Sequence, residues 1–164
     1  MLILPGAAFA ADKTYLGLSM INSNYQDTSH NHRSVGLLGR LGYDLSKHFA
    51  AEIHFGGSIG PENKADTNVG QAQMSDLYSG FLRMNAQFGN KRVYALAGMS
   101  YGNALVTPPG SLAAIKSNHT NKSFGLGIEL HGNDEIGFDL ELVRYFDNKA
   151  FTVDAFNLGL VTHF

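Results

Sequence analysis

The chain has 164 residues, enough for one domain and hardly enough for two. Hydrophobic residues make up 44%, which excludes a disordered chain, while charged residues are only 16%, against about 25% in an average soluble domain. The formal net charge of −2 argues against a nucleic-acid binder, and the absence of cysteine excludes disulfide scaffolds, thiol nucleophiles and cysteine-ligated zinc. No apolar run reaches the roughly 18 residues that a membrane-spanning helix needs.

The first ten residues are apolar and end in Ala8-Phe9-Ala10, the small-x-small pattern that signal peptidase reads. The basic start of a secretory signal is missing. We therefore expect residues 1–10 to be the remnant of a secretory signal peptide and residues 11–164 to form a single exported domain. An apolar segment that packs against the fold is the alternative.

From Asp12 onward, apolar residues alternate with small or polar ones, and this period of two predicts β-strands. Five segments show it clearly, at residues 14–22, 35–43, 49–56, 122–131 and 136–142. Three noisier segments lie at residues 75–86, 93–105 and 152–164. The sequence thus predicts eight strands without any long helix between them, and at most one helical turn within residues 108–115.

The predicted connections fall into two groups. Short polar ones lie at residues 44–48, 87–92 and 132–135. The connections between them are residues 22–33, 57–74 and 103–121, which are long and polar, and the shorter 147–151. Short turns at one end and long loops at the other are typical of an up-and-down meander.

An eight-stranded meander can close as a soluble barrel or as a membrane barrel. One face of these strands is bulky and uncharged, whereas the other is mostly Gly, Ser and Ala with isolated charges. The bulky face would be a large apolar patch in water, while the small residues suit a narrow lumen. All seven lysines lie in predicted connections or at strand ends, as expected if a lysine at the bilayer midplane costs about 2–4 kcal/mol.

Aromatic residues near the ends of the segments predict interfacial girdles, formed by Tyr43, Phe49, Tyr94, Tyr101, Phe146 and Phe164. The predicted fold is therefore all-β, an eight-stranded antiparallel up-and-down transmembrane β-barrel.

The isolated charges are predicted to pair inside the lumen, because buried charges without partners are costly. A first tight turn centred on Ser46 would place Arg40 opposite Glu52, and Arg83 is available for Glu129 or the other acids. The predicted lumen charge network is Arg40, Glu52, Arg83, Glu129, Asp139 and Glu141. An interior filled by side chains is expected for eight strands. A proton or ion pathway is the alternative interpretation.

The last tight turn, if centred on Asn133, would place Asp139 opposite Gly127 and Glu141 opposite Gly125. Each carboxylate would then face a residue without a side chain and reach towards the barrel axis.

The hairpin of residues 36–52 and the end of the chain, residues 156–164, resemble the small outer membrane β-barrels of Gram-negative bacteria, the OmpA/OmpX/Opa-like superfamily. The resemblance implies a location in the outer membrane and a C-terminal signal that the insertion machinery reads: Phe156, Leu158, Leu160 and Phe164. The pattern departs at Thr162, where an aromatic residue is commoner, and at Val143 and Arg144, which break the alternation and suggest a bulge. Barrels of this fold serve as anchors, adhesins and occasionally enzymes.

Lipid hydrolysis on this fold would use a His/Ser pair with a carboxylate on the outer wall. The only His-x-Ser, His32-Arg33-Ser34, ends a predicted loop, and His119 and Ser123 lie on the lumen parity. We therefore expect no catalytic residues and no enzyme.

Histidines raise the question of a metal. His30 and His32, with Asp27 nearby, could bind one, but two histidines in a polar loop are more often solvated. The other candidates, His54, His131 and His163, lie on the lumen parity and are predicted to be hydrogen-bonded fillers, with pH sensitivity as the alternative. No nucleotide-binding glycine motif occurs. We expect no metal and no cofactor.

The loops remain as candidate functional elements, since a rigid scaffold can present them. We expect a monomeric, non-enzymatic outer membrane protein that presents surface loops for adhesion or interaction, or that supports envelope integrity. Its expected partners are outer membrane lipid and lipopolysaccharide, the insertion machinery, and a host or matrix ligand at the loops. A lipid A deacylase or acyltransferase and, less favoured, a soluble small-ligand carrier are the alternatives.

Overall fold

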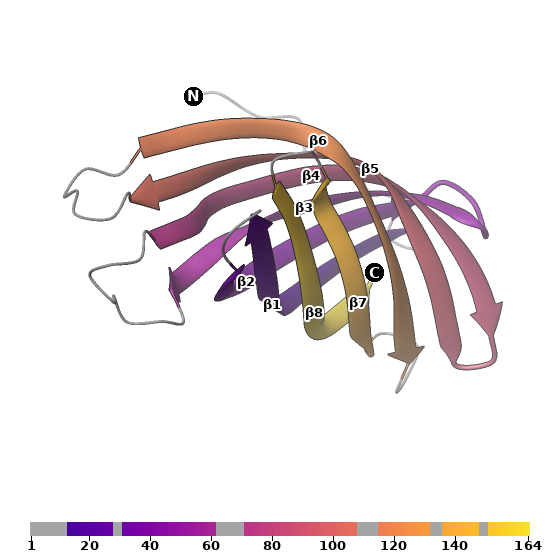
Figure 1. Cartoon of the computed structure of the whole chain (residues 1–164). Coiled ribbons are helices and arrows are strands. Elements are labelled where there is room, and N and C mark those ends of the chain that lie inside the picture. The colour runs from indigo at the N-terminus through magenta and orange to yellow at the C-terminus, as the bar shows by residue number, and fades with distance from the viewer. Residues whose placement is uncertain (1–12, 28–30, 62–70, 108–114, 132–135, 148–150) are drawn as a thin grey trace, which may run out of the picture.

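The computed structural model describes residues 13–27, 31–61, 71–107, 115–131, 136–147 and 151–164. Its eight strands form one closed antiparallel barrel in chain order, which confirms the predicted fold class (Figure 1). The strands are β1 (Thr14–Asp27), β2 (Asn31–Asp44), β3 (Phe49–Pro61), β4 (Gln71–Phe88), β5 (Lys91–Thr107), β6 (Ile115–His131), β7 (Ile136–Asp147) and β8 (Phe151–His163). None of the described segments is a helix long and apolar enough to cross a membrane.

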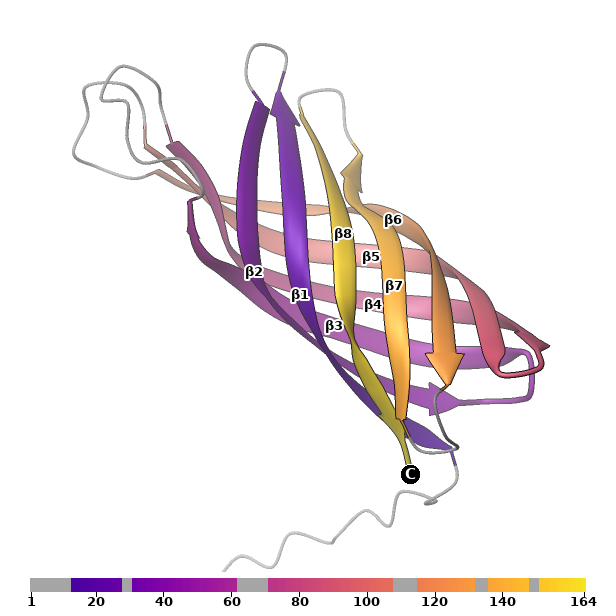
Figure 2. The ribbon, with the colours of Figure 1, turned by 90° about the horizontal axis from the view of Figure 1, so that it is seen from below.

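The barrel has two unlike ends. At the turn end lie the start of β1, the end of β8 and the turns that join β2 to β3 and β4 to β5 (Figure 2). Gly89 adopts a φ of 61°, as the first position of a two-residue type II′ hairpin requires. At the opposite, loop end, β1 is joined to β2, β3 to β4, β5 to β6 and β7 to β8.

The segments predicted as long connections are in part strand, so those predicted boundaries were wrong. Strands cover residues 22–27, 31–33, 57–61, 71–74, 103–107 and 115–121 of them. Hydrophobic alternation ceases there while strand pairing continues, because backbone hydrogen bonds do not depend on apolar side chains. Lys122 accordingly lies within β6 and not at a strand end. The helical turn predicted at residues 108–115 lies outside the described residues, apart from Ile115, which begins β6.

Side chains alternate between the outer wall and the lumen as the sequence predicts. Bulky apolar residues lie on the outer wall, where Leu18 is 62% and Leu126 68% exposed. Tyr43, Phe49, Tyr101 and Phe164 are also exposed there, as expected of girdle residues.

Two of the predicted girdle aromatics are inside the barrel instead. Tyr94 is 4% exposed and Phe146 2% exposed. Tyr94 has the inward parity of β5, and the register shift between Arg144 and Phe146 in β7 turns Phe146 inward. This bulge lies near the predicted break in alternation, and its effect on Phe146 was not foreseen.

Both predicted hairpin registers are off by two residues. The sequence predicted Arg40 opposite Glu52, Asp139 opposite Gly127 and Glu141 opposite Gly125. The observed pairs are Arg40 with His54, Gly42 with Glu52, Glu129 with Asp139, and Gly127 with Glu141. A shift of two keeps every side chain on its predicted face. A shift of one would have moved the side chains of a strand to the opposite face of the sheet.

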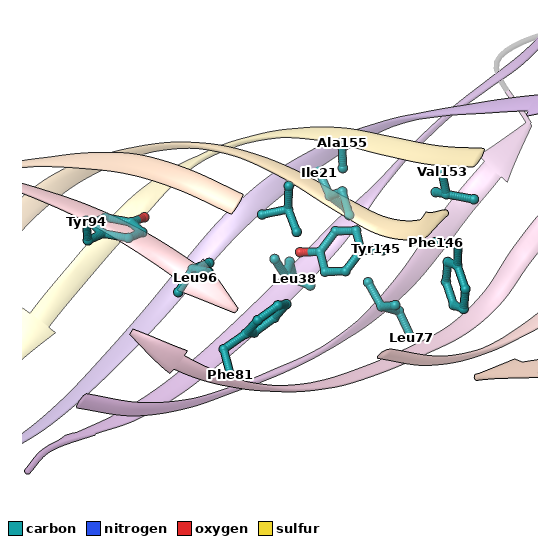
Figure 3. Close-up of a cluster of buried hydrophobic side chains, with 11 residues drawn as sticks. Ile21, Leu38, Leu77, Phe81, Tyr94, Leu96, Tyr145, Phe146, Val153 and Ala155 are labelled. Atoms are coloured by element: carbon teal, nitrogen blue, oxygen red, sulfur yellow. The ribbon is translucent and has the colours of Figure 1, made fainter. Parts of the chain in front are cut away.

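Apolar side chains fill part of the lumen, which was predicted to be lined mainly by small residues. A cluster on the loop side of the lumen includes Leu38, Phe81, Leu96 and Tyr145 (Figure 3). A smaller cluster of Tyr15, Ala50 and Val161 lies towards the turn end. Apolar side chains thus share the lumen with the polar residues.

Glycines opposite large residues make room for these side chains. Tyr15 pairs with Gly42 across β1 and β2, and Tyr94 pairs with Gly127 across β5 and β6. A Cβ atom at Gly42 would lie 1.9 Å from Cζ of Tyr15, and one at Gly127 would lie 2.2 Å from Cζ of Tyr94. Each tyrosine ring therefore lies against the backbone of its neighbouring strand, in space that a side chain at the glycine would fill.

We predict that Gly127→Ala lowers the free energy of unfolding by about 1–3 kcal/mol, because the new methyl group would displace the buried Tyr94 ring. Urea unfolding of the barrel in lipid or detergent measures this change. Gly80→Ala is the matched control, since a Cβ at Gly80 meets nothing within 4 Å. Equal effects of the two substitutions would contradict this packing.

Candidate functional site

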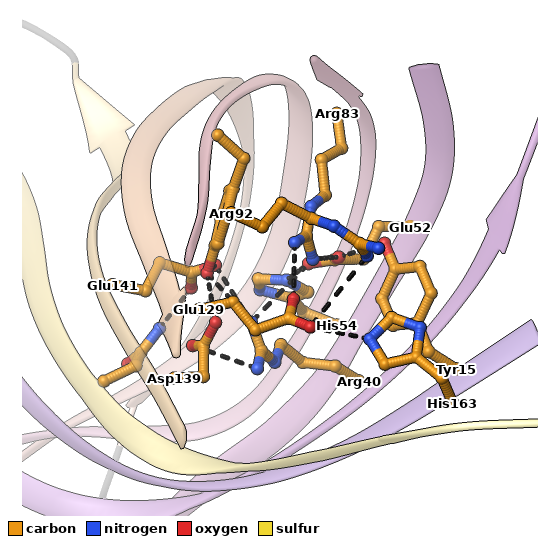
Figure 4. A network of polar contacts seen from close by, with 12 residues as sticks. Tyr15, Arg40, Glu52, His54, Arg83, Arg92, Glu129, Asp139, Glu141 and His163 are labelled. Atoms are coloured by element: carbon orange, nitrogen blue, oxygen red, sulfur yellow. Dashed lines mark hydrogen bonds and ion pairs between the residues drawn. The ribbon is translucent and has the colours of Figure 1, made fainter. Parts of the chain in front are cut away.

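All six residues of the predicted lumen charge network meet inside the barrel. They come from β2, β3, β4, β6 and β7, and their side chains are 0% exposed in the ion pairs that join them (Figure 4).

Arg83 joins two strands that are not neighbours. Its Nη1 atom lies 3.0 Å from Oε2 of Glu52 on β3, and its Nη2 atom lies 2.7 Å from Oε2 of Glu129 on β6. The Nε atom donates to Oδ1 of Asn85 at 2.8 Å. The guanidinium carbon lies 3.7 Å from the centroid of the Tyr94 ring, a cation–π contact. All sides of this buried cation are thereby occupied.

Arg40 performs the same role with the carboxylates of β7. Its Nη2 atom lies 2.9 Å from Oδ2 of Asp139, and its Nη1 atom lies 3.3 Å from Oε2 of Glu141. Glu52 is more distant, at 4.0 Å, although the sequence predicted it as the direct partner. Arg40 lies opposite Gly17, where a Cβ would be 2.9 Å from Nε, so this glycine also frees space for a large side chain.

The network has four carboxylates and two arginines, so the carboxylates need further hydrogen-bond donors. Polar residues that were not among the six predicted members provide them. Tyr94 donates to Oδ1 of Asp139 at 2.7 Å or to Oε2 of Glu141 at 3.0 Å. Tyr15 donates to Glu52, and Asn157 donates to Oε1 of Glu141 at 2.7 Å.

His54 contacts the remaining oxygen of Glu52 through Nε2 and Tyr145 Oη through Nδ1. The position of Tyr15 and Tyr94 on the lumen parity was the available signal for including both tyrosines. Nothing in the sequence singled out Asn157.

The chemistry of this site is charge pairing in a solvent-poor interior. Its members are guanidinium groups, carboxylates, phenols, an imidazole and a carboxamide, each with contacts to other members. Towards the loop end, Ser79, Ser100 and Ser123 form a hydrogen-bonded chain, in which Ser100 Oγ lies 2.7 Å from Ser79 Oγ and 2.6 Å from Ser123 Oγ. Ser123 also lies 2.7 Å from the backbone oxygen of Tyr145, so its hydroxyl is inside the barrel and away from lipid.

The predicted C-terminal signal residues lie on the outer wall of the barrel. Phe156, Leu158 and Leu160 of β8 are 45%, 47% and 49% exposed, and Phe164 is 57% exposed. Recognition of these residues by the insertion machinery stays a prediction. His30 lies outside the described residues, and the side chains of Asp27, His32 and His119 are also outside the description.

We predict that Arg83→Met lowers the free energy of unfolding by about 3–5 kcal/mol, because it leaves Glu52 and Glu129 buried without their cation. Arg144→Gln is the matched control. Its ion pair with Asp154, 2.7 Å long and 38% and 41% exposed at the two side chains, should contribute only about 0–1 kcal/mol. Urea unfolding in detergent micelles distinguishes the two. A loss below about 1 kcal/mol for Arg83→Met would contradict the network's role.

Many solved structures resemble the barrel, among them the three that follow. The Ail protein of Yersinia pestis, described as an attachment invasion locus protein, has a TM-score of 0.71 and 13% identity, covering 93% of this chain and 99% of that chain. The N-terminal barrel domain of Pseudomonas aeruginosa OprF has a TM-score of 0.66 and 14% identity, covering 92% and 97%. Neisserial surface protein A has a TM-score of 0.65 and 13% identity, also covering 92% and 97%. Identities this low show a shared fold.

The comparison with curated proteins finds no match to this sequence. The family comparison does, since the profile of the outer membrane protein beta-barrel domain matches residues 1–164. Together with the closed eight-stranded barrel, this match shows that the chain belongs to the outer membrane protein beta-barrel domain family.

Proposed function

We propose that this protein is a monomeric, non-enzymatic barrel of the Gram-negative outer membrane that presents its loop end as an interaction surface. The filled lumen carries this proposal. Paired charges and apolar side chains occupy the lumen between the described residues, which supports a role other than transport. Removal of residues 1–10 as a signal remnant is part of the same proposal.

Three of the strands, β4, β5 and β6, are clearly longer than a membrane requires. A tilted transmembrane strand needs about 9–11 residues, whereas β4 has 18 and β5 and β6 have 17 each. Tyr78 and Tyr101 pair across β4 and β5 on the outer wall and are exposed, which fits the outer membrane–water interface. Residues 71–76, beyond this pair, are largely polar. A rim of β-sheet that projects from the membrane would hold the connecting segments away from the lipid surface.

Adhesion is the interaction that we propose, with support from one structural neighbour. Ail of Yersinia pestis has also been solved in complex with sucrose octasulfate, a heparin analogue, with a TM-score of 0.70 and 12% identity to this chain. A host or matrix ligand at the loop end is therefore our proposal for this chain. Catalysis on lipid has less support, because the Ser123 hydroxyl lies in the lumen.

We predict that replacing residues 62–70 or 108–114 by a short Gly-Ser linker abolishes binding of expressing cells to heparin or to extracellular matrix. The barrel should remain folded, because the lumen contacts that hold it are made by residues of the strands. Surface abundance and a heat-dependent gel shift confirm folding of each variant. Cells that bind equally well with both segments replaced would refute loop-mediated adhesion.

An outer-wall groove near the loop end supports a second candidate function, binding of outer-leaflet lipid in support of the envelope. Its volume is about 760 Å³, and its apolar part includes Phe124, Leu142 and Phe156. Its polar part includes Arg33 and the Arg144–Asp154 ion pair. The Arg33 guanidinium beside apolar side chains suits a phosphorylated lipid headgroup with its acyl chains. Lipopolysaccharide is the anionic lipid that we propose for this groove.

We predict that Arg33→Gln weakens lipopolysaccharide binding to the barrel in nanodiscs by at least about tenfold, since a hydrogen bond to a charged group contributes about 1.5–3 kcal/mol. Competition with a fluorescent lipopolysaccharide measures this affinity. Arg92→Gln, at the turn end, is the matched control and should leave the affinity unchanged. Equal affinity for the Arg33 variant and the unaltered protein would remove the groove from the proposal.

A further inference from the structure

Three metal-ligating side chains converge at the turn end of the lumen. Glu129 and His131 belong to β6 and His163 to β8, and one ligand atom of each lies within 4.8 Å of the other two. Oε1 of Glu129 is 2.6 Å from Nε2 of His163 and 2.9 Å from Nε2 of His131. Figure 4 shows His163 facing Glu129 at the edge of the charge network.

The two histidines meet across a strand that carries a glycine. Gly137 of β7 pairs with His131 on one side and with Val161 on the other. A Cβ at Gly137 would lie 3.2 Å from Cγ of Glu129 and 3.2 Å from Cγ1 of Val161. The centroids of the two imidazoles are 5.4 Å apart.

The carboxylate is already oriented for a ligand. Arg83 holds its Oε2 atom at 2.7 Å, which leaves Oε1 directed to the histidines. Nε2 of His131 is buried and forms no hydrogen bond with any described residue, because its short contact with Oε1 lacks hydrogen-bond geometry. A buried nitrogen without a hydrogen bond beside a carboxylate oxygen is what a metal ion would satisfy.

We propose that Glu129, His131 and His163 bind a Zn²⁺ ion through Oε1, Nε2 and Nε2, with the fourth position left to water or a small ligand. Two histidines and one glutamate are an established donor set for zinc. Bonds of about 2.0–2.1 Å in a tetrahedron place ligand atoms about 3.3 Å apart, so the observed separations must open by less than about 1 Å. The imidazoles are 14% and 17% exposed, which leaves them room to move and access to solution.

This site differs from the expectation that the histidines are fillers and that no metal binds. The sequence places His131 and His163 thirty-two positions apart, and the pairing of β6 with β7 and of β7 with β8 brings them together. A bound ion would connect β6 to β8 at the end where the chain's last strand closes the barrel.

The positive charge of Arg92 near Glu129 provides a further way to distinguish a metal site from an ion-pair network. Nη1 of Arg92 lies 3.9 Å from Oε1 of Glu129, and its positive charge opposes a cation at that oxygen. Arg92→Gln should therefore tighten zinc binding. The same substitution in a purely structural ion-pair network would remove a contact and create no affinity for a metal.

The test is calorimetric titration of ZnCl2 into the full chain in detergent micelles, without a histidine tag, together with the visible absorption of bound Co²⁺. We expect one zinc ion per barrel and a four-coordinate Co²⁺ band. His131→Gln and His163→Gln should each weaken binding at least about tenfold. His48→Gln is the matched control, because His48 is exposed in the turn between β2 and β3 at the same end.

Absence of zinc binding by the unaltered barrel would overturn the proposal, as would equal binding by the His131→Gln, His163→Gln double variant. A heat-dependent gel shift identifies variants that fold. If the histidine variants do not fold, the decision rests on the unaltered barrel and Arg92→Gln, and the proposal fails if Co²⁺ shows no four-coordinate band. The loop-end functions are tested separately and do not depend on this result.

Discussion

The structure depends on the burial of two guanidinium groups at the centre of the lumen. An ion removed from water loses several kcal/mol of solvation, which only close partners can offset. Arg40 and Arg83 obtain these partners from strands far apart in the sequence, so the network forms only when the barrel is closed. Every strand contributes to it: Tyr15 from β1, Arg40 from β2, Glu52 from β3, Arg83 from β4, Tyr94 from β5, Glu129 from β6, Asp139 and Glu141 from β7, and Asn157 from β8.

Space is the second constraint. A narrow lumen can hold two arginines and several aromatic rings only if other inward positions carry no side chain. Gly17 opposite Arg40 and Gly127 opposite Tyr94 provide that space. Part of the high glycine content is thus explained by the large inward side chains, because each needs a neighbouring position without a side chain.

Much of this could be predicted from the alternation of side chains. Period two identified the eight strands, the inward face and the six buried charges, because each depends only on which side of a strand a residue occupies. Details that depend on turn geometry could not be predicted, and both hairpin registers were off by two. Phe146 was misplaced because a bulge in β7 changes the parity locally. Strand ends beyond the membrane, such as Asp27 of β1, carry no hydrophobic pattern that would reveal them.

Filling the lumen has a consequence for function. A barrel whose interior is occupied by paired charges has its ends and its outer wall left for interaction, which is why the proposals concern the loop end, the groove at Arg33 and the turn-end histidines. The turn-end histidines lie at the other end of the barrel from the first two, and each proposal can be tested by its own substitutions.

The sealed lumen itself is tested most directly by cysteine reactivity, since the chain contains no cysteine of its own. Single variants Met99→Cys and Ser100→Cys place a thiol at adjacent positions of β5, one 58% exposed on the outer wall and one 1% exposed in the lumen. In membranes, Met99→Cys should react with a lipid-soluble maleimide, and Ser100→Cys should resist a small, charged, water-soluble reagent until the barrel is unfolded. Rapid reaction of Ser100→Cys with the charged reagent in the folded barrel would mean that water fills the lumen, and would contradict the account.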